Sequence, residues 1–265
     1  MMSGEKLSKA SDRPNLVLIH GWGYDKSCWP AELLSTLKAQ FNLILLQLPG
    51  HSLGDSVDDS LNNELDSVEQ LDIWIQQQRA LLPDDYSLLG WSLGGQVAIR
   101  FAHNNTQVQR LILLATNPKF VCAQDWECAM EVDVFSQFCS HYQNNPIATL
   151  KRFVSLQTQG CSQRIQLGTQ LVRLMQPAPA KFLGLQLLGQ LDEREHLSNL
   201  LIPCLIELAQ ADSLAPAQWI EHMPLPAQSV VNAVEGGHAY PIQDQHLGQR
   251  VVHFLTSSIP SQATS

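Results

Sequence analysis

Four short apolar runs, each ending in turn-forming residues, constrain the fold of this chain more than any other feature. They are NLVLIHGWG (15–23), NLILLQLPGHS (42–52), YSLLGWSLGG (86–95) and VQRLILLATNP (108–118). Continuous runs of Leu, Ile and Val between turns are typical of strands that are buried on both faces of a parallel sheet. The sequence therefore predicts that each run is a strand of such a sheet.

Helical patterns separate the runs. Segments 28–40 and 67–82 repeat apolar residues every three or four positions, and strand-like runs return at 202–212 and 227–239, before a last helical segment at 247–257. Strands that alternate with helices imply right-handed crossovers and a mostly parallel, doubly wound α/β fold.

The alternation stops near Asn117. From there to about residue 185 the sequence has a helical period and is richer in Met, Phe, Cys and Gln. We therefore expect a core made of residues 1–116 and 186–265, interrupted by a helical cap at 117–185.

Composition and charge narrow the class of protein. The 265 residues suffice for one large domain, 45% of them are hydrophobic, and no apolar stretch reaches the ~18 residues that a membrane span needs. The net charge of −9 argues against bulk binding of nucleic acid. The N-terminus is polar, without an apolar signal region, and none of the six cysteines forms a C-x-x-C pair. We therefore expect a cytoplasmic protein with reduced thiols and no bound metal.

The strongest motif for chemistry is Gly90-Trp91-Ser92-Leu93-Gly94, which fits the G-x-S-x-G pattern of a nucleophile elbow. It follows a predicted strand and precedes a predicted helix. The turn is so sharp that only small side chains fit two positions before and after the serine. A turn with a passive serine is the alternative, because the pattern alone also occurs by chance.

A second element, HGWG at 20–23, favours the elbow. It follows the first predicted strand, where a second oxyanion donor is expected in such folds. We expect the backbone N–H groups of Trp22 and Leu93 to hold a developing oxyanion, aided by the positive end of the following helix.

A serine nucleophile needs a base, and the base needs a carboxylate, in the chain order Ser, acid, His. His238 follows the predicted strand SVVNAV and two glycines, so it lies on a loop at a strand end. We predict that it is the base. The other histidines precede the acid, lie in helices or the cap, or are surface residues: His20, His51, His103, His141, His196, His222, His246 and His253.

Two carboxylates compete for the role of the acid. Asp212 lies just beyond the strand CLIELAQ, on a turn, whereas Glu207 lies inside the strand, where the pleat fixes its direction. We favour Asp212 as the third member of a Ser92–Asp212–His238 triad.

With these residues in place, the chain resembles the α/β-hydrolase superfamily over nearly its full length. Within the superfamily it is most similar to the pimeloyl-[acyl-carrier protein] methyl ester esterases of biotin synthesis, through LVLIHGWG (16–23), GWSLGG (90–95) and RFVSLQTQG (152–160). The resemblance implies a helical cap, a Ser-His-Asp triad, no cofactor, and hydrolysis of a methyl ester on an acyl chain tethered to acyl carrier protein.

The chain also departs from that family. Gln47 stands where an Asp usually precedes LPG, and Ala209 and Ser213 replace glycines around the acid. Other readings are a broad short-chain carboxylesterase, a carbon–carbon bond hydrolase, a menaquinone-pathway synthase, and a binding protein on an inactive scaffold. The intact triad residues argue against the last.

Two further expectations concern the cap and its partner. Phe135, Phe138, Phe153 and Leu156 are predicted to form an acyl channel, unless they only pack the cap on itself.

Because carrier proteins are strongly acidic and this chain is net negative, docking needs a local positive surface. We expect Lys151, Arg152, Arg164 and Arg173 to supply it, the alternative being an ordinary solvated helix face. We also expect the protein to be a monomer.

Overall fold

The computed structural model describes residues 13–51, 66–175 and 181–257. The N-terminal segment in which we expect no export signal lies mostly outside these residues. Among the described helices, none combines the length and apolar character needed to cross a bilayer.

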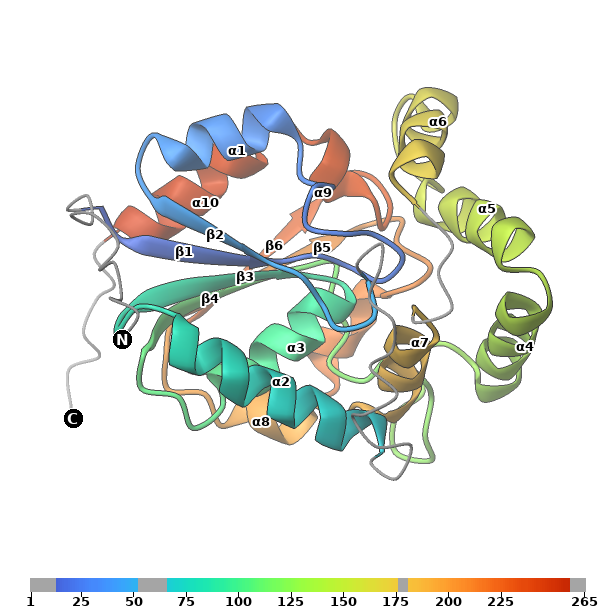
Figure 1. Ribbon diagram of the computed structural model, residues 1–265, viewed down its shortest axis with the longest axis horizontal. Helices are drawn as coiled ribbons and strands as arrows, with labels where there is room; N and C mark the ends of the chain where they lie inside the picture. The colour runs from blue at the N-terminus through green and yellow to red at the C-terminus, as the bar shows by residue number, and fades with distance from the viewer. Residues whose placement is uncertain (1–12, 52–65, 176–180, 258–265) are drawn as a thin grey trace, which may run out of the picture.

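Six parallel strands form one sheet in the order β2-β1-β3-β4-β5-β6 (Figure 1). This confirms the predicted doubly wound parallel sheet. The strands are β1 (Asn15–Ile19), β2 (Asn42–Leu46), β3 (Tyr86–Trp91), β4 (Val108–Leu114), β5 (Cys204–Ala209) and β6 (Ser229–Val234). The apolar residues of the central strands β1, β3, β4 and β5 are buried, as expected for continuous Leu, Ile and Val runs.

Helices cover both faces of the sheet (Figure 1). The helices α1 (Ala31–Lys38) and α10 (Leu247–Thr256) pack together on one face, and α2 (Ser67–Leu81), α3 (Leu93–Ala102) and α8 (Arg194–Ser198) lie on the other. Asp66 starts α2 with a capping box, in which it accepts from the N–H groups of Val68 and Glu69. The short helices η1 (Ala217–Glu221) and α9 (Tyr240–Gln243) follow β5 and β6.

The segment between β4 and β5 contains helices α4 to α7, and α4 to α6 project beyond one end of the sheet (Figure 1). Their bounds are α4 (Val132–Asn144), α5 (Pro146–Gln157), α6 (Arg164–Leu174) and α7 (Lys181–Gln190). Asn145 ends α4 and caps α5, where Pro146 occupies the first turn. Helix α7 contacts α2 and α3 of the core as well as α4. The cap boundary that we predict at residue 185 therefore falls inside a helix that touches both parts.

Candidate active site

Ser92 occupies the sharp turn between β3 and α3, at the carboxyl end of a central strand. Its φ of 57° and ψ of −121° lie in a region that non-glycine residues rarely adopt. A Cβ on Gly90 would lie 2.3 Å from the carbonyl oxygen of Gly94, and a Cβ on Gly94 would lie 2.2 Å from that of Ile19. Both glycines are therefore required by close backbone approach. The N–H of Ser92 donates to the carbonyl of Leu114, which ties the turn to β4.

The structure brings Ser92, His238 and Asp212 together. The hydroxyl Oγ of Ser92 lies 2.8 Å from Nε2 of His238, and Nδ1 of His238 lies 2.8 Å from Oδ2 of Asp212. The other carboxylate oxygen of Asp212 accepts from the N–H groups of Leu214 and Ala215. Ser92, Asp212 and His238 are buried, and Ser92 retains 8% exposure. This arrangement fits a nucleophile, a base and a group that orients the base.

Glu207, the competing carboxylate, is engaged elsewhere. Its two oxygens accept from the guanidinium of Arg250 at 2.8 and 2.9 Å, and Oε1 also accepts from Asn232. The side chain is fully buried within β5. Glu207 and Arg250 therefore form a structural ion pair that joins β5 to α10.

The residues that differ from the family pattern leave the carboxylate of Asp212 in place. Gln47 accepts a hydrogen bond from the N–H of Lys26. Ala209 is buried at the end of β5, and Ser213 points into solvent beside Asp212.

Two other histidines are buried near the turn after β1. His20 and His51 pack edge to face with their ring centroids 5.3 Å apart. Burial lowers the pKa of His20 to about 4 and the pKa of His51 well below its usual value. Burial also lowers the pKa of Lys181 to about 8, and its Nζ donates to the carbonyl of Gly23. Among the remaining histidines, His103 stacks on His196, and His141, His222, His246 and His253 are exposed.

The HGWG turn lies directly against the serine. A Cβ on Gly21 would lie 3.4 Å from Cβ of Ser92, so the backbone before Trp22 adjoins the nucleophile. Leu93 is the first residue of α3, where a backbone N–H has no partner within the helix. The side chain of Trp22 is buried and donates to the carbonyl of Lys181. The backbone of both residues thus lies beside Ser92.

Sequence reasoning missed Trp91, which holds the loop of His238. The indole Nε1 of Trp91 donates to the carbonyl of His238 at 3.1 Å. Its ring stacks on Tyr24 with centroids 5.0 Å apart. The only sequence signal was the tryptophan itself, at a position of the motif that accepts any residue.

A family model described as the alpha/beta hydrolase family matches residues 16–251. The chain belongs to the α/β hydrolase family. An esterase from Exiguobacterium antarcticum has the same fold, with a TM-score of 0.79 and 20% identity over 94% of each chain. MenH from S. aureus is also similar in fold, with a TM-score of 0.72 and 18% identity over 93% of this chain and 94% of that chain.

Relatives that are similar in sequence share more residues with this chain than these solved structures do. This α/β hydrolase is 33% identical to the pimeloyl-[acyl-carrier protein] methyl ester esterase of Nitrosomonas europaea, over 90% of this chain and 94% of the relative. It is 34% identical to the biotin biosynthesis bifunctional protein BioHC of Teredinibacter turnerae, over 95% of this chain and 46% of the relative. The chain therefore spans about half the length of that bifunctional protein.

An apolar cavity of about 20 Å³ lies where the cap meets the core of the hydrolase. All four side chains that we expect to form an acyl channel line it, together with Trp22 from the HGWG turn. The complete lining is Trp22, Phe120, Met130, Phe135, Phe138, Phe153, Leu156, Leu185, Leu188 and Leu214. The rings of Trp22 and Phe153 meet edge to face at 4.9 Å. The cavity has room for about one water molecule, so an acyl chain enters only if these side chains move.

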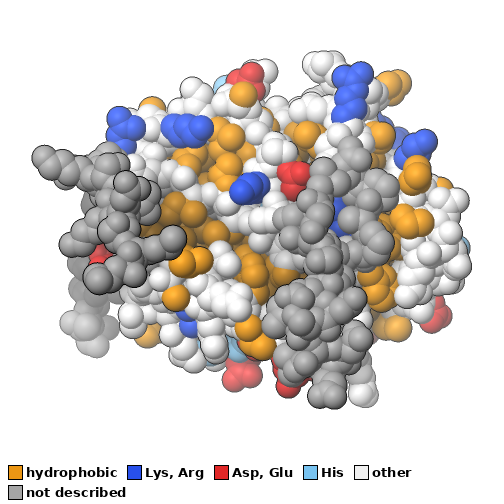
Figure 2. Space-filling model, in the orientation of Figure 1, with side chains coloured by type: hydrophobic (Ala, Val, Ile, Leu, Met, Phe, Trp, Pro, Cys, Tyr) orange, Lys and Arg blue, Asp and Glu red, His pale blue; other side chains and the backbone are white. Residues whose placement is uncertain are grey.

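The four predicted docking residues are all exposed on the cap of this hydrolase. Lys151 and Arg152 lie on α5, and Arg164 and Arg173 lie on α6. Figure 2 shows Lys and Arg side chains over the part of the molecule where α5 and α6 lie in Figure 1. The guanidinium of Arg164 donates to the hydroxyl of Ser155, which links the two helices. No cluster of three or more metal-ligating side chains occurs among the described residues.

Proposed function

We propose that this α/β hydrolase is a serine carboxylesterase that hydrolyses the methyl ester of pimeloyl-acyl carrier protein in biotin biosynthesis. The observation that carries the proposal is the chain of 2.8 Å contacts from Ser92 through His238 to Asp212. The substrate class rests on relatives about one third identical that are named for this activity.

In the proposed mechanism, Nε2 of His238 takes the proton of Ser92 as Oγ attacks the ester carbonyl. The N–H groups of Trp22 and Leu93 stabilise the oxyanion. His238 then gives the proton to the departing methoxide, which leaves as methanol. Water, activated by the same imidazole, releases the free carboxylic acid, while Asp212 keeps the imidazole oriented and stabilises its charge.

The apolar cavity supports an acyl substrate. Trp22 borders it, and Leu214 links it to the loop of Asp212, so it lies next to the proposed triad. A methylene chain gains about 0.8 kcal/mol per CH₂ removed from water, which offsets the movement of the aromatic rings. Phe153 is proposed as a substrate-binding residue on this wall.

The carrier protein is proposed to dock on the exposed cations of the cap. The one candidate surface that we derive from the sequence consists of Lys151, Arg152, Arg164 and Arg173, and carrier proteins are acidic.

We further propose a cytoplasmic monomer that needs no cofactor. The proposed triad comes from a single chain, and all six cysteines are unpaired, in keeping with a reducing compartment. Light scattering of the purified protein measures its oligomeric state.

The test is hydrolysis of pimeloyl-acyl carrier protein methyl ester by the intact protein. We expect turnover, and we expect Ser92→Ala to lower kcat at least ~10³-fold with the fold retained. Ser140→Ala, exposed on α4, is the matched control. Faster hydrolysis of short free esters than of the carrier-bound ester would instead favour a broad carboxylesterase. No hydrolysis of any ester would favour a carbon–carbon bond hydrolase, a synthase or a binding protein.

A further inference from the structure

The backbone around His238 is held by the cap. The N–H of Ala239, just after the histidine, donates to the carbonyl of Gln157 at 3.0 Å. The N–H of Gly237, just before it, donates to Sγ of Cys161 at 3.2 Å. Both acceptors belong to one stretch at the end of α5, so the cap holds the peptide groups on either side of the proposed base.

The same stretch is fastened to the core through buried side chains. Oε1 of Gln157 accepts from the hydroxyl of Tyr24 at 2.5 Å. Tyr24 stacks on Trp91, whose indole donates to the carbonyl of His238. Gln157, Tyr24 and Trp91 are at most 1% exposed. The contacts therefore close a ring from His238 through the core to the cap and back.

The two loops pack so closely that no side chain fits between them at two glycines. A Cβ on Gly237 would lie 1.8 Å from the carbonyl oxygen of Gln159. A Cβ on Gly160, whose φ is +79°, would lie 2.3 Å from Cβ of Ala211, next to the proposed acid. The turn after α5 thus packs against the loops of both His238 and Asp212.

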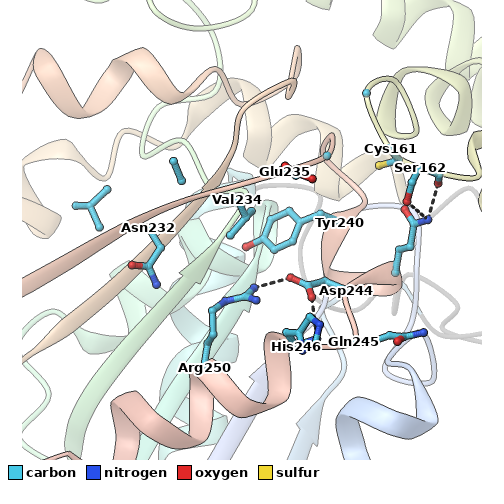
Figure 3. Close-up of a pocket in the computed structure, with 15 residues that line it drawn as sticks. Cys161, Ser162, Asn232, Val234, Glu235, Tyr240, Asp244, Gln245, His246 and Arg250 are labelled. Carbon is cyan, nitrogen blue, oxygen red and sulfur yellow. Dashed lines mark hydrogen bonds and ion pairs between the residues drawn. The ribbon is translucent and has the colours of Figure 1, made fainter.

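A groove of about 980 Å³ lies beside the contact between the end of α5 and the loop of His238 (Figure 3). Cys161 and Ser162 from the cap face the loop of Glu235 across it (Figure 3). The side-chain amide of Gln243, on α9, donates to the hydroxyl of Ser162 at 2.8 Å. This bond fastens the cap turn to the helix that follows His238.

We propose that Gln157 and Cys161 are positioning residues for His238, acting through its flanking peptide groups. The segment 157–161 fixes the direction in which the imidazole meets Ser92. The proposal rests on the role of Ser92 and His238 in the proposed function. It explains why the RFVSLQTQG stretch, although it belongs to the cap, ends against the loops of the proposed triad.

Three variants test the proposal. Cys161→Ala removes the acceptor of the Gly237 N–H, and Cys161→Ser restores an acceptor of similar size. Gln157→Met keeps the bulk of the side chain and the backbone carbonyl that accepts from Ala239. It leaves the Tyr24 hydroxyl without its partner, so it tests how the segment is fastened to the core. Cys139→Ala, a half-buried cysteine of the same cap, is the matched control. Thermal unfolding of every variant checks its fold.

The readouts are kcat and KM for a small ester and the rate at which a fluorophosphonate modifies Ser92. We expect Cys161→Ala and Gln157→Met to lower kcat and the modification rate about 10-fold with KM unchanged, because a small misplacement of a base is costly. Cys161→Ser should recover most of the loss, and Cys139→Ala should show none.

Equal rates in Cys161→Ala, Gln157→Met and wild type would overturn the proposal. So would a loss confined to KM, or a loss that Cys161→Ser does not repair. The fluorophosphonate reports on Ser92 and His238 without the natural substrate. A wild-type protein that reacts with it but leaves the carrier-bound ester intact would therefore contradict the proposed substrate and not the positioning role.

Discussion

At the scale of single residues, Asp212 and Glu207 carry the same functional group but bond to different kinds of partner. Asp212 accepts from two backbone N–H groups and from the imidazole of His238. Glu207 is buried against Arg250. Removing the charge of each therefore has different consequences for activity and stability.

We expect Asp212→Asn to lower kcat about 10⁴-fold. The amide neither holds the imidazole of His238 in the correct tautomer nor supplies a negative charge to stabilise the imidazolium. Glu207→Gln should leave kcat within about 10-fold of wild type while lowering the free energy of unfolding by roughly 2 kcal/mol, since Arg250 keeps its ion pair with Asp244 but loses the charge of Glu207. Steady-state kinetics and denaturant unfolding on both variants measure the two effects. The opposite ranking of kcat would assign the role of the acid to Glu207.

His20 should make the fold sensitive to acid. The unfolded chain binds a proton at His20 below about pH 6.5, whereas burial delays protonation in the folded state to about pH 4. Over this window the unfolded state holds more protons, so stability falls as the pH falls. The shift corresponds to roughly 3 kcal/mol, at about 1.4 kcal/mol per pH unit.

Denaturant unfolding at pH 7 and pH 4.5 measures this contribution. His20→Gln should lose less stability between the two values than wild type, whatever its stability at pH 7. His253→Gln, on the surface of α10, is the control and should follow wild type. A His20→Gln variant that loses as much as wild type would show that other groups cause the sensitivity.

At the scale of elements, the strands were predictable because burial on both faces demands unbroken apolar runs. Residues 86–91 show this for β3, and the glycines around Ser92 predicted the turn that follows. The contacts of Gln157 were not predictable, because Tyr24 lies 133 positions away in the chain. The sequence also did not predict that α7 contacts both the core and the cap, since such a helix has no distinct local pattern.

The cap helices lead to a prediction about chain length. Phe153→Ala should lower kcat/KM about 10-fold more for medium-chain esters than for acetate esters, because in the proposed function only the longer chain reaches the apolar cavity. Phe254→Ala, on α10 away from the cap, controls for general loss of packing. Equal losses on both esters would mean that Phe153 only packs the cap.

At the scale of the whole molecule, the net charge of −9 opposes an encounter with an acidic partner. Reversing Arg152 and Arg164 to Glu should raise KM for the carrier-bound ester about 10-fold and leave a small free ester unchanged. Added salt should have the same effect on wild type, since exposed charges are screened beyond about 8 Å at physiological ionic strength.

Lys38→Glu, exposed on α1, makes a charge reversal outside the cap and serves as the control. If the double variant is impaired on both esters, the cap itself is damaged. If it is impaired on neither, the docking surface lies elsewhere.

The joint between the end of α5 and the loop of His238 also limits how such enzymes can be recombined. A cap transplanted from another hydrolase would bring a new substrate pocket but would replace the segment that presents the Gln157 carbonyl and the Cys161 thiol to the loop of His238. Splice points at residues 156 and 163 would leave those acceptors with the recipient. Chimeras cut there should inherit a new specificity without losing their base, whereas chimeras cut at the ends of the whole insertion should fold around a misdirected imidazole.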